Sequence, residues 1–175
     1  GNYNTVVGNE AGTAITTGDN NTAVGFEALS TEDANSYNTA VGYRALKTLN
    51  AGADAYSTAV GADAGTSITT GLYNNLIGGL AGANITTGDE NIAIGVNSLT
   101  AETAGNKTIA IGGGALAAQN STSDTDMFNV GVGYHAGNDV TTGRYNTLMG
   151  AIAADSVTEG GRNTALGYGA LQTDT

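Results

Sequence analysis

The sequence predicts an all-β fold, namely a parallel β-solenoid of about ten 17-residue coils assembled side by side as a homo-oligomer. Three observations support this fold. One motif recurs ten times at nearly constant spacing. Glycine, threonine and asparagine, which are poor helix formers, supply 28, 26 and 19 of the 175 residues. The chain has no proline, which would remove a backbone donor from the bonds between stacked coils.

The motif reads Asn-Thr-Ala-Val-Gly-x-x-Ala and is cleanest at residues 21–28 and 38–45. Its glycines are Gly8, Gly25, Gly42, Gly61, Gly78, Gly95, Gly112, Gly133, Gly150 and Gly167. They are 17 residues apart except at two places, where spacings of 19 and 21 residues contain insertions near 49–56 and 119–127. The sequence therefore predicts a single repeat array over 1–175, which we expect to be a segment of a longer fibre. Its coils would stack about 4.8 Å apart.

Each repeat predicts a short strand followed by a corner and a turn. The strand covers the alternating residues that end on the motif glycine, which we expect to hold a backbone angle that other residues resist. The turn occurs in two forms, one with a late isoleucine or valine, as in 64–71, and one with an early leucine, as at Leu46. Each form supplies one sizeable apolar residue, so we expect both to fill the same interior space.

Strand side chains alternate between two faces, which divides the motif into an inward and an outward row. The residue before the motif glycine is apolar in every copy, and we predict that this row, with Val41 as an example, points inward. The preceding residue should then point outward and, being small and apolar along the whole rod, should line a homo-oligomer contact around a three-fold axis. This predicted interface consists of Val6, Ala23, Ala40, Ala59, Leu76, Ala93, Ala110, Leu148 and Ala165, with Gly131 in the same row.

Two further rows flank the strand. The motif opens on asparagine in eight copies, and stacked asparagine side chains can form a hydrogen-bonded ladder along the rod, although asparagine is also a common turn residue. The residue before it is aromatic in six copies. Among these, Tyr37, Tyr56, Tyr73 and Tyr145 are candidate glycan contacts. The alternative is that the rings cover coil edges or a neighbouring subunit.

The segments Asn-Thr-Ala-Val-Gly-Tyr-x-Ala-Leu and Ser-Ile-Thr-Thr-Gly-x-x-Asn resemble repeats of tail-fibre and fibre-like proteins from phages and environmental bacteria. The Ala-Val/Ile-Gly-x-x-Ala core is also similar to the head repeats of trimeric autotransporter adhesins. The resemblance covers all ten copies and implies a parallel β-roll assembled as a trimer. The 17-residue coil is longer than the coil of those adhesin heads.

The sequence contains no recognisable catalytic group of residues, so we expect a protein that is not an enzyme and needs no cofactor. The single histidine, His135, occupies a motif position that other copies fill with residues such as Glu27 and Arg44, which indicates a variable surface position. Asp124 and Asp126 lie in the longer insertion among serine and asparagine residues, and this oxygen-rich loop is a weak candidate for Ca²⁺.

The composition and charge of the chain limit the kinds of partner that it can bind. The net charge is -11 with five basic residues, which argues against nucleic-acid binding, and no apolar run is long enough to span a membrane. We therefore expect an extracellular structural protein, a rigid shaft segment of a phage tail fibre or a cell-surface filament, forming a trimer or an end-to-end polymer. The alternative is a glycan-binding adhesin or receptor-binding head.

Overall fold

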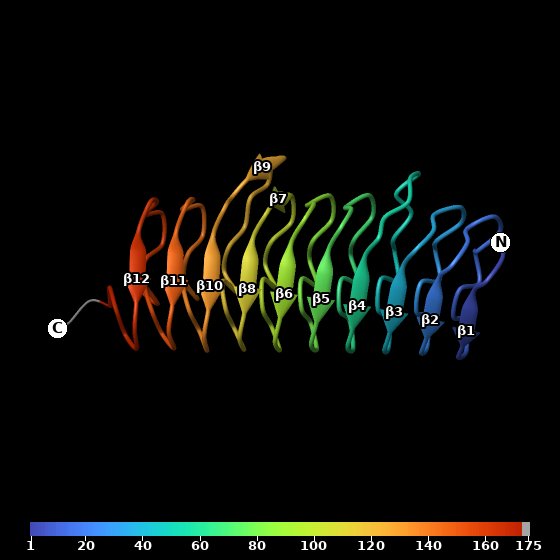
Figure 1. The fold of residues 1–175 in the computed structure, drawn as a ribbon, viewed down its shortest axis with the longest axis horizontal. Helices are drawn as coiled ribbons and strands as arrows, with labels where there is room; N and C mark the ends of the chain where they lie inside the picture. The colour runs from blue at the N-terminus through green and yellow to red at the C-terminus, as the bar shows by residue number, and fades with distance from the viewer. Residues whose placement is uncertain (173–175) are drawn as a thin grey trace.

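The computed structural model describes residues 1–172, which form an all-β rod without any helix (Figure 1). None of these residues belongs to a helix that could cross a membrane. Ten strands of three residues each lie side by side along the rod. They are β1 (Thr5–Val7), β2 (Thr22–Val24), β3 (Thr39–Val41), β4 (Thr58–Val60), β5 (Asn75–Ile77), β6 (Ile92–Ile94), β8 (Ile109–Ile111), β10 (Val130–Val132), β11 (Thr147–Met149) and β12 (Thr164–Leu166).

These ten strands form one parallel sheet whose order follows the chain, which confirms the predicted solenoid of about ten coils roughly 17 residues apart. Neighbouring strands pair in motif register, so that Ala40 lies beside Ala23 on one side and Ala59 on the other. Outside the strands, backbone bonds also join corresponding positions of neighbouring coils, such as Leu29 N to Ala45 O at 3.0 Å. Hydrogen bonds therefore connect the coils all around the rod.

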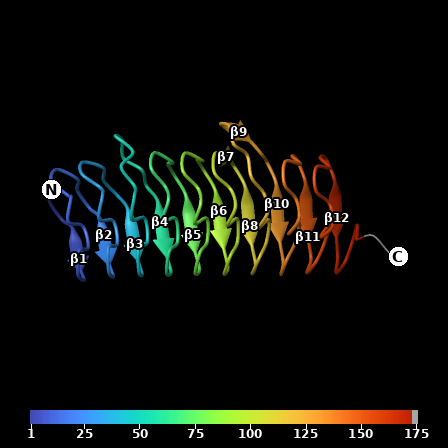
Figure 2. The same ribbon diagram turned by 180° about the vertical axis from the view of Figure 1, so that it is seen from behind.

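The two insertions protrude from the same edge of the rod, above the tips of the other coils (Figures 1 and 2). The second insertion contains β9 (Thr125–Asp126), which pairs in parallel with β7 (Gly105–Asn106) of an earlier coil. This two-stranded sheet fastens the insertion to the rod without interrupting the main sheet, since β8 still pairs directly with β10.

The predicted orientation of the strand faces is wrong. The row expected outside is inside: Ala23, Ala40, Ala59, Leu76, Ala93, Ala110 and Leu148 are fully buried, Ala165 is 4% exposed, and Gly131 is also buried. Val6, in the first coil of the stack, is the exception at 43% exposed. The row expected inside instead faces outward, and its members Val60 and Ile77 are exposed. The alanine row is therefore inside the rod and cannot form the predicted contact between subunits.

The inward residues are small because the rod is narrow behind the sheet. At Gly131, a Cβ atom would lie 2.8 Å from Leu116 Cγ and 3.1 Å from the Ala136 carbonyl oxygen, so the opposite wall already fills that space. A valine or isoleucine throughout this row would overpack the interior. The outward row has no such limit, and it therefore contains the larger side chains.

Interior volume is shared between neighbouring coils. Leu29 of one turn form and Ile68 of the other are both fully buried, which confirms that the two forms fill the same core. Where a glycine replaces the early leucine, a larger inward side chain takes the space. A Cβ atom on Gly82 would lie 2.8 Å from Leu76 Cδ2, and one on Gly137 would lie 2.5 Å from Leu148 Cδ1.

The motif glycines form the corner that the repeat predicts. All ten have positive φ, and Gly95 is an example at 131°. A Cβ atom there would also lie 2.6 Å from the carbonyl oxygen of Gly112 in the next coil. Glycine is therefore required twice at this position, for its backbone angle and for the close stacking of corners.

The motif asparagines bind along the rod, but to backbone rather than mainly to each other. Asn21 Oδ1 accepts a bond from Asn38 N at 2.9 Å in the next coil, and its Nδ2 donates to Asn35 O at 2.8 Å. The same pair of bonds recurs at Asn74, Asn91, Asn129 and Asn146. At Asn38, where the first insertion follows, Nδ2 has no partner. Each buried asparagine with both bonds thus closes its own coil and joins it to the next.

Candidate interaction surfaces

The outer face of the ten-stranded sheet contains an apolar row along its whole length. The residue before the motif glycine points outward in every strand and is never polar: Val7, Val24, Val41, Val60, Ile77, Ile94, Ile111, Val132, Met149 and Leu166. The first strand position, on the same face, is threonine or asparagine in the first five and last two strands, and it is apolar at Ile92, Ile109 and Val130 in between. Neither row contains a charged residue, although the chain has a net charge of -11. Such a long, uncharged face is typical of a surface that another molecule covers.

A second surface is the aromatic row before the motif asparagines. Tyr37, Tyr56 and Tyr73 of three successive coils are about half exposed and stack on each other, with ring centroids 4.9 Å and 5.9 Å apart. Positive φ angles between 48° and 65° turn all three side chains to the same side. Desolvation, followed by the nearby Asp54, raises the pKa of the Tyr56 phenol.

This stacking limits what the tyrosines can bind. The rings of Tyr37 and Tyr56 are nearly parallel, with an interplanar angle of 2°, so each covers a face of the other. Tyr56 is covered on its second face by Tyr73. Sugars stack on the faces of aromatic rings, and this ladder offers solvent mainly ring edges and hydroxyl groups. The geometry therefore favours the alternative that the rings cover the coil edges.

Farther along the rod the same row becomes cationic. Phe128 and Tyr145 stack at 5.7 Å, Lys107 Nζ lies 5.6 Å from the Phe128 centroid, and Arg162 Cζ lies 5.4 Å from the Tyr145 centroid. Arg144, the neighbour of Tyr145 in sequence, places its Cζ 5.3 Å from the same ring. Three of the five basic residues of the chain thus gather here. Cation–π contacts fix the two guanidinium groups beside Tyr145.

Next to this cluster lies a pocket of about 250 Å³ between the second insertion and the following coil. Its wall consists of Ser121, Thr125, Met127, Thr142 and Arg144. The wall thus contains three hydroxyl-bearing residues and one arginine, and the hydroxyls of Ser121 and Thr125 are bonded to Ser123.

The calcium candidates lie beside this pocket but are already engaged. Asp126 Oδ2 accepts from Lys107 Nζ at 2.8 Å, and Asp124 Oδ1 accepts from Asn106 Nδ2 at 2.6 Å. The bond from Lys107 lowers the pKa of the Asp126 carboxyl. Within residues 1–172, no group of three or more histidine, cysteine or acidic residues is placed to hold a metal ion. A cation at this loop would have to compete with Lys107.

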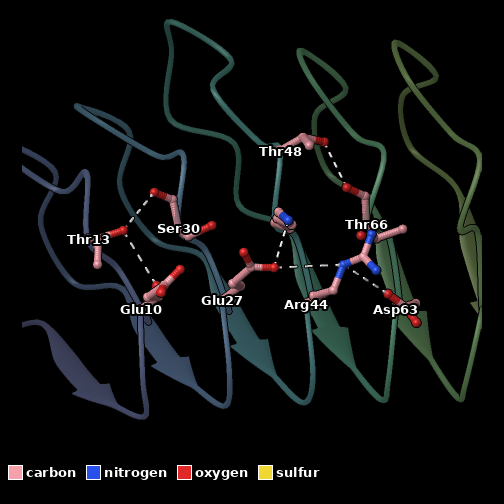
Figure 3. Close-up of polar contacts among 9 residues, drawn as sticks. Glu10, Thr13, Glu27, Ser30, Arg44, Thr48, Asp63 and Thr66 are labelled. Carbon is pink, nitrogen blue, oxygen red and sulfur yellow. Dashed lines mark hydrogen bonds and ion pairs between the residues drawn. The ribbon is translucent and has the colours of Figure 1, made fainter.

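The motif position of His135 forms a charged row in the first coils (Figure 3). Arg44 Nε lies 3.9 Å from Glu27 Oε2 and 3.5 Å from Asp63 Oδ1, and Lys47 Nζ lies 2.6 Å from the same Glu27 oxygen. Partly exposed pairs of this kind contribute little individually to stability. They do balance charge between neighbouring coils.

His135 itself is half-buried rather than fully exposed, and it stacks on Tyr134 at 4.1 Å. A Cβ atom on Gly114 of the preceding coil would lie 2.6 Å from its Cδ2. The adjacent notch of about 380 Å³ is lined by Tyr134 and by Gly113, among other residues. His135 thus packs against Tyr134 and Gly114 in the wall of this notch.

Two of these features do not follow from the sequence prediction. The Arg144 pocket depends on how the second insertion folds back, which no local motif indicates, although the clustering of basic residues after Asn106 is a visible signal. The exposed valine and isoleucine row is evident in the sequence, but the prediction places it on the wrong side. Comparison of the chain with protein-family models, curated proteins and solved structures finds no match.

Proposed function

We propose that this chain is a structural shaft segment of an extracellular fibre, as in a phage tail fibre or a cell-surface filament. In this proposal, copies of the rod pack together through the outer face of the main sheet. One observation supports it above all others: the row from Val7 to Leu166 is apolar in ten of ten coils and faces outward. An isolated rod would gain nothing from that uniformity, because outward strand positions tolerate threonine or lysine.

The proposed occupant of this face is a second copy of the chain. A surface with one side chain every ~4.8 Å is matched along its full length by a partner with the same repeat, which a second copy has by construction. The absence of charge from both outward rows also matters, because two rods of net charge -11 repel each other over most of their surface. The outer sheet face is where two copies can meet without bringing like charges together.

The size of the face agrees with this role. Ten strands extend over roughly 43 Å and three residues span roughly 10 Å, before the relief of the side chains is counted. Exposed side chains that directly follow the strands, such as Phe26, Tyr43 and Tyr134, extend the apolar surface. The strands alone give roughly 430 Å², about half of the ~800 Å² per partner that stable interfaces bury, and these side chains add to that area. A three-fold arrangement, as the resemblance to trimeric adhesin heads implies, would cover this narrow face from two sides.

The test is the mass of the assembly in solution. Light scattering or sedimentation of the purified chain is expected to give an oligomer, with a trimer as the specific expectation. Val41→Lys combined with Ile94→Lys should yield monomers with an unchanged β-sheet circular dichroism spectrum. Thr70→Lys, at an exposed position outside the strands, is the matched control and should leave the oligomer intact. A monomeric wild-type chain, or a double variant of unchanged mass, would refute the packing proposal.

A further inference from the structure

We infer that the pocket beside the second insertion binds a carboxylate-bearing sugar, with Arg144 as the residue that holds the carboxylate. This inference is independent of the proposed assembly, because it concerns the insertion edge of the rod and not the outer sheet face. It rests on three observations: an arginine without an acidic partner, hydroxyl groups arranged around it, and the charge of the surroundings.

Arg144 is available for a ligand. Across residues 1–172, no carboxylate oxygen lies within 4.0 Å of its guanidinium nitrogens, whereas Arg44, Lys47 and Lys107 each have such a partner. The Tyr145 ring lies against its Cζ at 5.3 Å and restricts its orientation. A planar guanidinium held in this way is suited to bidentate contact with a carboxylate.

The other pocket residues suit a small polyhydroxy ligand. Thr142 offers a hydroxyl group that can both donate and accept hydrogen bonds. Ser121 Oγ donates to Ser123 O and Thr125 Oγ1 bonds to Ser123 Oγ, and both oxygens can still accept from a ligand. The volume of about 250 Å³ is below the range typical of drug-sized ligands, so the pocket accepts one small group such as a single sugar unit. The ring faces of Tyr145 are occupied by Phe128 and the arginines, so recognition must come from charge and hydroxyl groups rather than from stacking.

Charge around the pocket also favours an anion. Asp126 is the nearby acid that could repel one, and it is already paired with Lys107 at 2.8 Å. The other acid of the insertion, Asp124, accepts its bond from the uncharged Asn106 side chain and so does not occupy either arginine. Arg144 and Arg162 add two positive charges beside the insertion in a chain of net charge -11, and Arg144 helps to lower the pKa of Asp126, whose ion-pair partner is Lys107. An anion attracted to this protein would be drawn to this place.

The experiment is calorimetric titration of the purified chain with methyl β-glucuronide, using methyl β-glucoside as the neutral analogue and sodium acetate as the sugar-free carboxylate. The inference expects binding of the glucuronide and at least ~10-fold weaker binding of both other probes. Arg144→Gln should weaken glucuronide binding by about 10-fold or more. Arg44→Gln, at a basic residue of the distant ion-pair row, should leave it unchanged.

Three outcomes would overturn the inference. They are absence of glucuronide binding, acetate binding as tightly as the glucuronide, and glucuronide binding that survives Arg144→Gln. Because Arg144 is exposed, that variant is expected to keep the wild-type melting temperature, and Thr142→Val provides a second pocket variant. Binding can be measured on monomers and oligomers alike, so this result and the assembly result are separable.

Discussion

Two buried glutamates occupy the same position in different coils, and the rod accommodates them very differently. Glu32 and Glu102 each lie three residues after the early leucine of their turn and are fully buried. Most other coils fill this position with apolar residues, such as Leu49 and Ile68, and one has Gln119. The two acids thus place a carboxyl group where the core is normally aliphatic.

Glu102 is surrounded by donors. Its Oε1 accepts from the backbone nitrogens of Thr103, Gly105 and Ser121 at 2.8 to 2.9 Å, and its Oε2 accepts from Gln119 Nε2 at 2.8 Å. Gln119 Oε1 in turn accepts from Asn129 at 2.8 Å. The result is a buried polar network with a partner for each of these groups.

Glu32 has far less support. Its Oε1 accepts from Asn35 N at 2.7 Å, and its Oε2 has no partner. Burial raises the pKa of its carboxyl, and the backbone bond from Asn35 offsets this only in part. The next coil explains the contrast, because the residue stacked at the same position is Gln119 in one case and the apolar Leu49 in the other. Glu102 therefore has a polar partner in the neighbouring coil, and Glu32 does not.

The largest expected effect comes from breaking the better-supported site. Glu102→Leu leaves the three backbone donors and Gln119 without their acceptor, and we expect it to lower the free energy of unfolding by about 3–5 kcal/mol. Denaturant-induced unfolding monitored by circular dichroism measures this. A variant as stable as wild type would show that the network around Glu102 does not stabilise the rod.

The same replacement in the other coil should act in the opposite direction. Glu32→Leu removes a poorly paired buried carboxyl group and installs the residue that the next coil already has at this position. We expect a gain of about 1–2 kcal/mol at pH 7, since the desolvation penalty exceeds the lost bond to Asn35. The measurement is the same unfolding curve. A loss comparable to that of Glu102→Leu would remove the distinction between the sites.

The pH dependence of Glu32 sharpens the comparison further. Because its pKa is raised in the folded chain above the ordinary value of 4.5, the protonated form favours folding. This stabilisation is fully present below pH 4.5 and is lost as the pH rises through the folded-state value. Glu32→Gln should therefore melt close to wild type at about pH 4 and above it at about pH 8. Melting temperatures that differ equally at both pH values would contradict the raised pKa.

The smallest change in stability is expected from giving Glu32 a polar residue in the next coil. Leu49→Gln places a donor where Gln119 stands relative to Glu102. The substitution alone disturbs an apolar site, but a double-mutant cycle with Glu32→Leu, which removes the acceptor, should reveal a favourable coupling of about 0.5–1 kcal/mol between Glu32 and the newly introduced amide. A coupling of zero would mean that the side chains do not meet across this pair of coils.

The repeat period was enough to predict the coil number, the parallel stacking, the insertions and the glycine corners. It could not decide which strand face is buried, because Ala40 and Val41 are both apolar and alternation alone is symmetric. The volume of the side chains is what shows which strand face is buried. Leu76 and Leu148 are large at otherwise small positions, and they lie beside Gly82 and Gly137 in the turns. Aligning the ten repeats position by position shows this pairing of a large inward residue with a glycine in the turn.

The candidate sites were less predictable for a related reason. Tyr37 and Tyr145 could be placed in one row from the period, but whether ring faces or ring edges meet solvent depends on side-chain rotation. Glu32 and Glu102 resemble ordinary surface acids until alignment puts them in register with Ile68. The Arg144 pocket requires the path of an insertion that has no counterpart in other coils. The repeat pattern describes only the regular coils, so it cannot predict how an insertion folds.

The direction of the inter-coil hydrogen bonds has a mechanical consequence. In the main sheet they run from strand to strand along the rod, so a pull on the two ends loads successive coils in series rather than in shear. The outermost coil would yield first and leave the next one intact, as expected for a stack of nearest-neighbour units. Each released coil of 17 residues would lengthen the molecule by roughly 50 Å. A single rod under tension would therefore extend in steps, absorbing force coil by coil instead of rupturing at once.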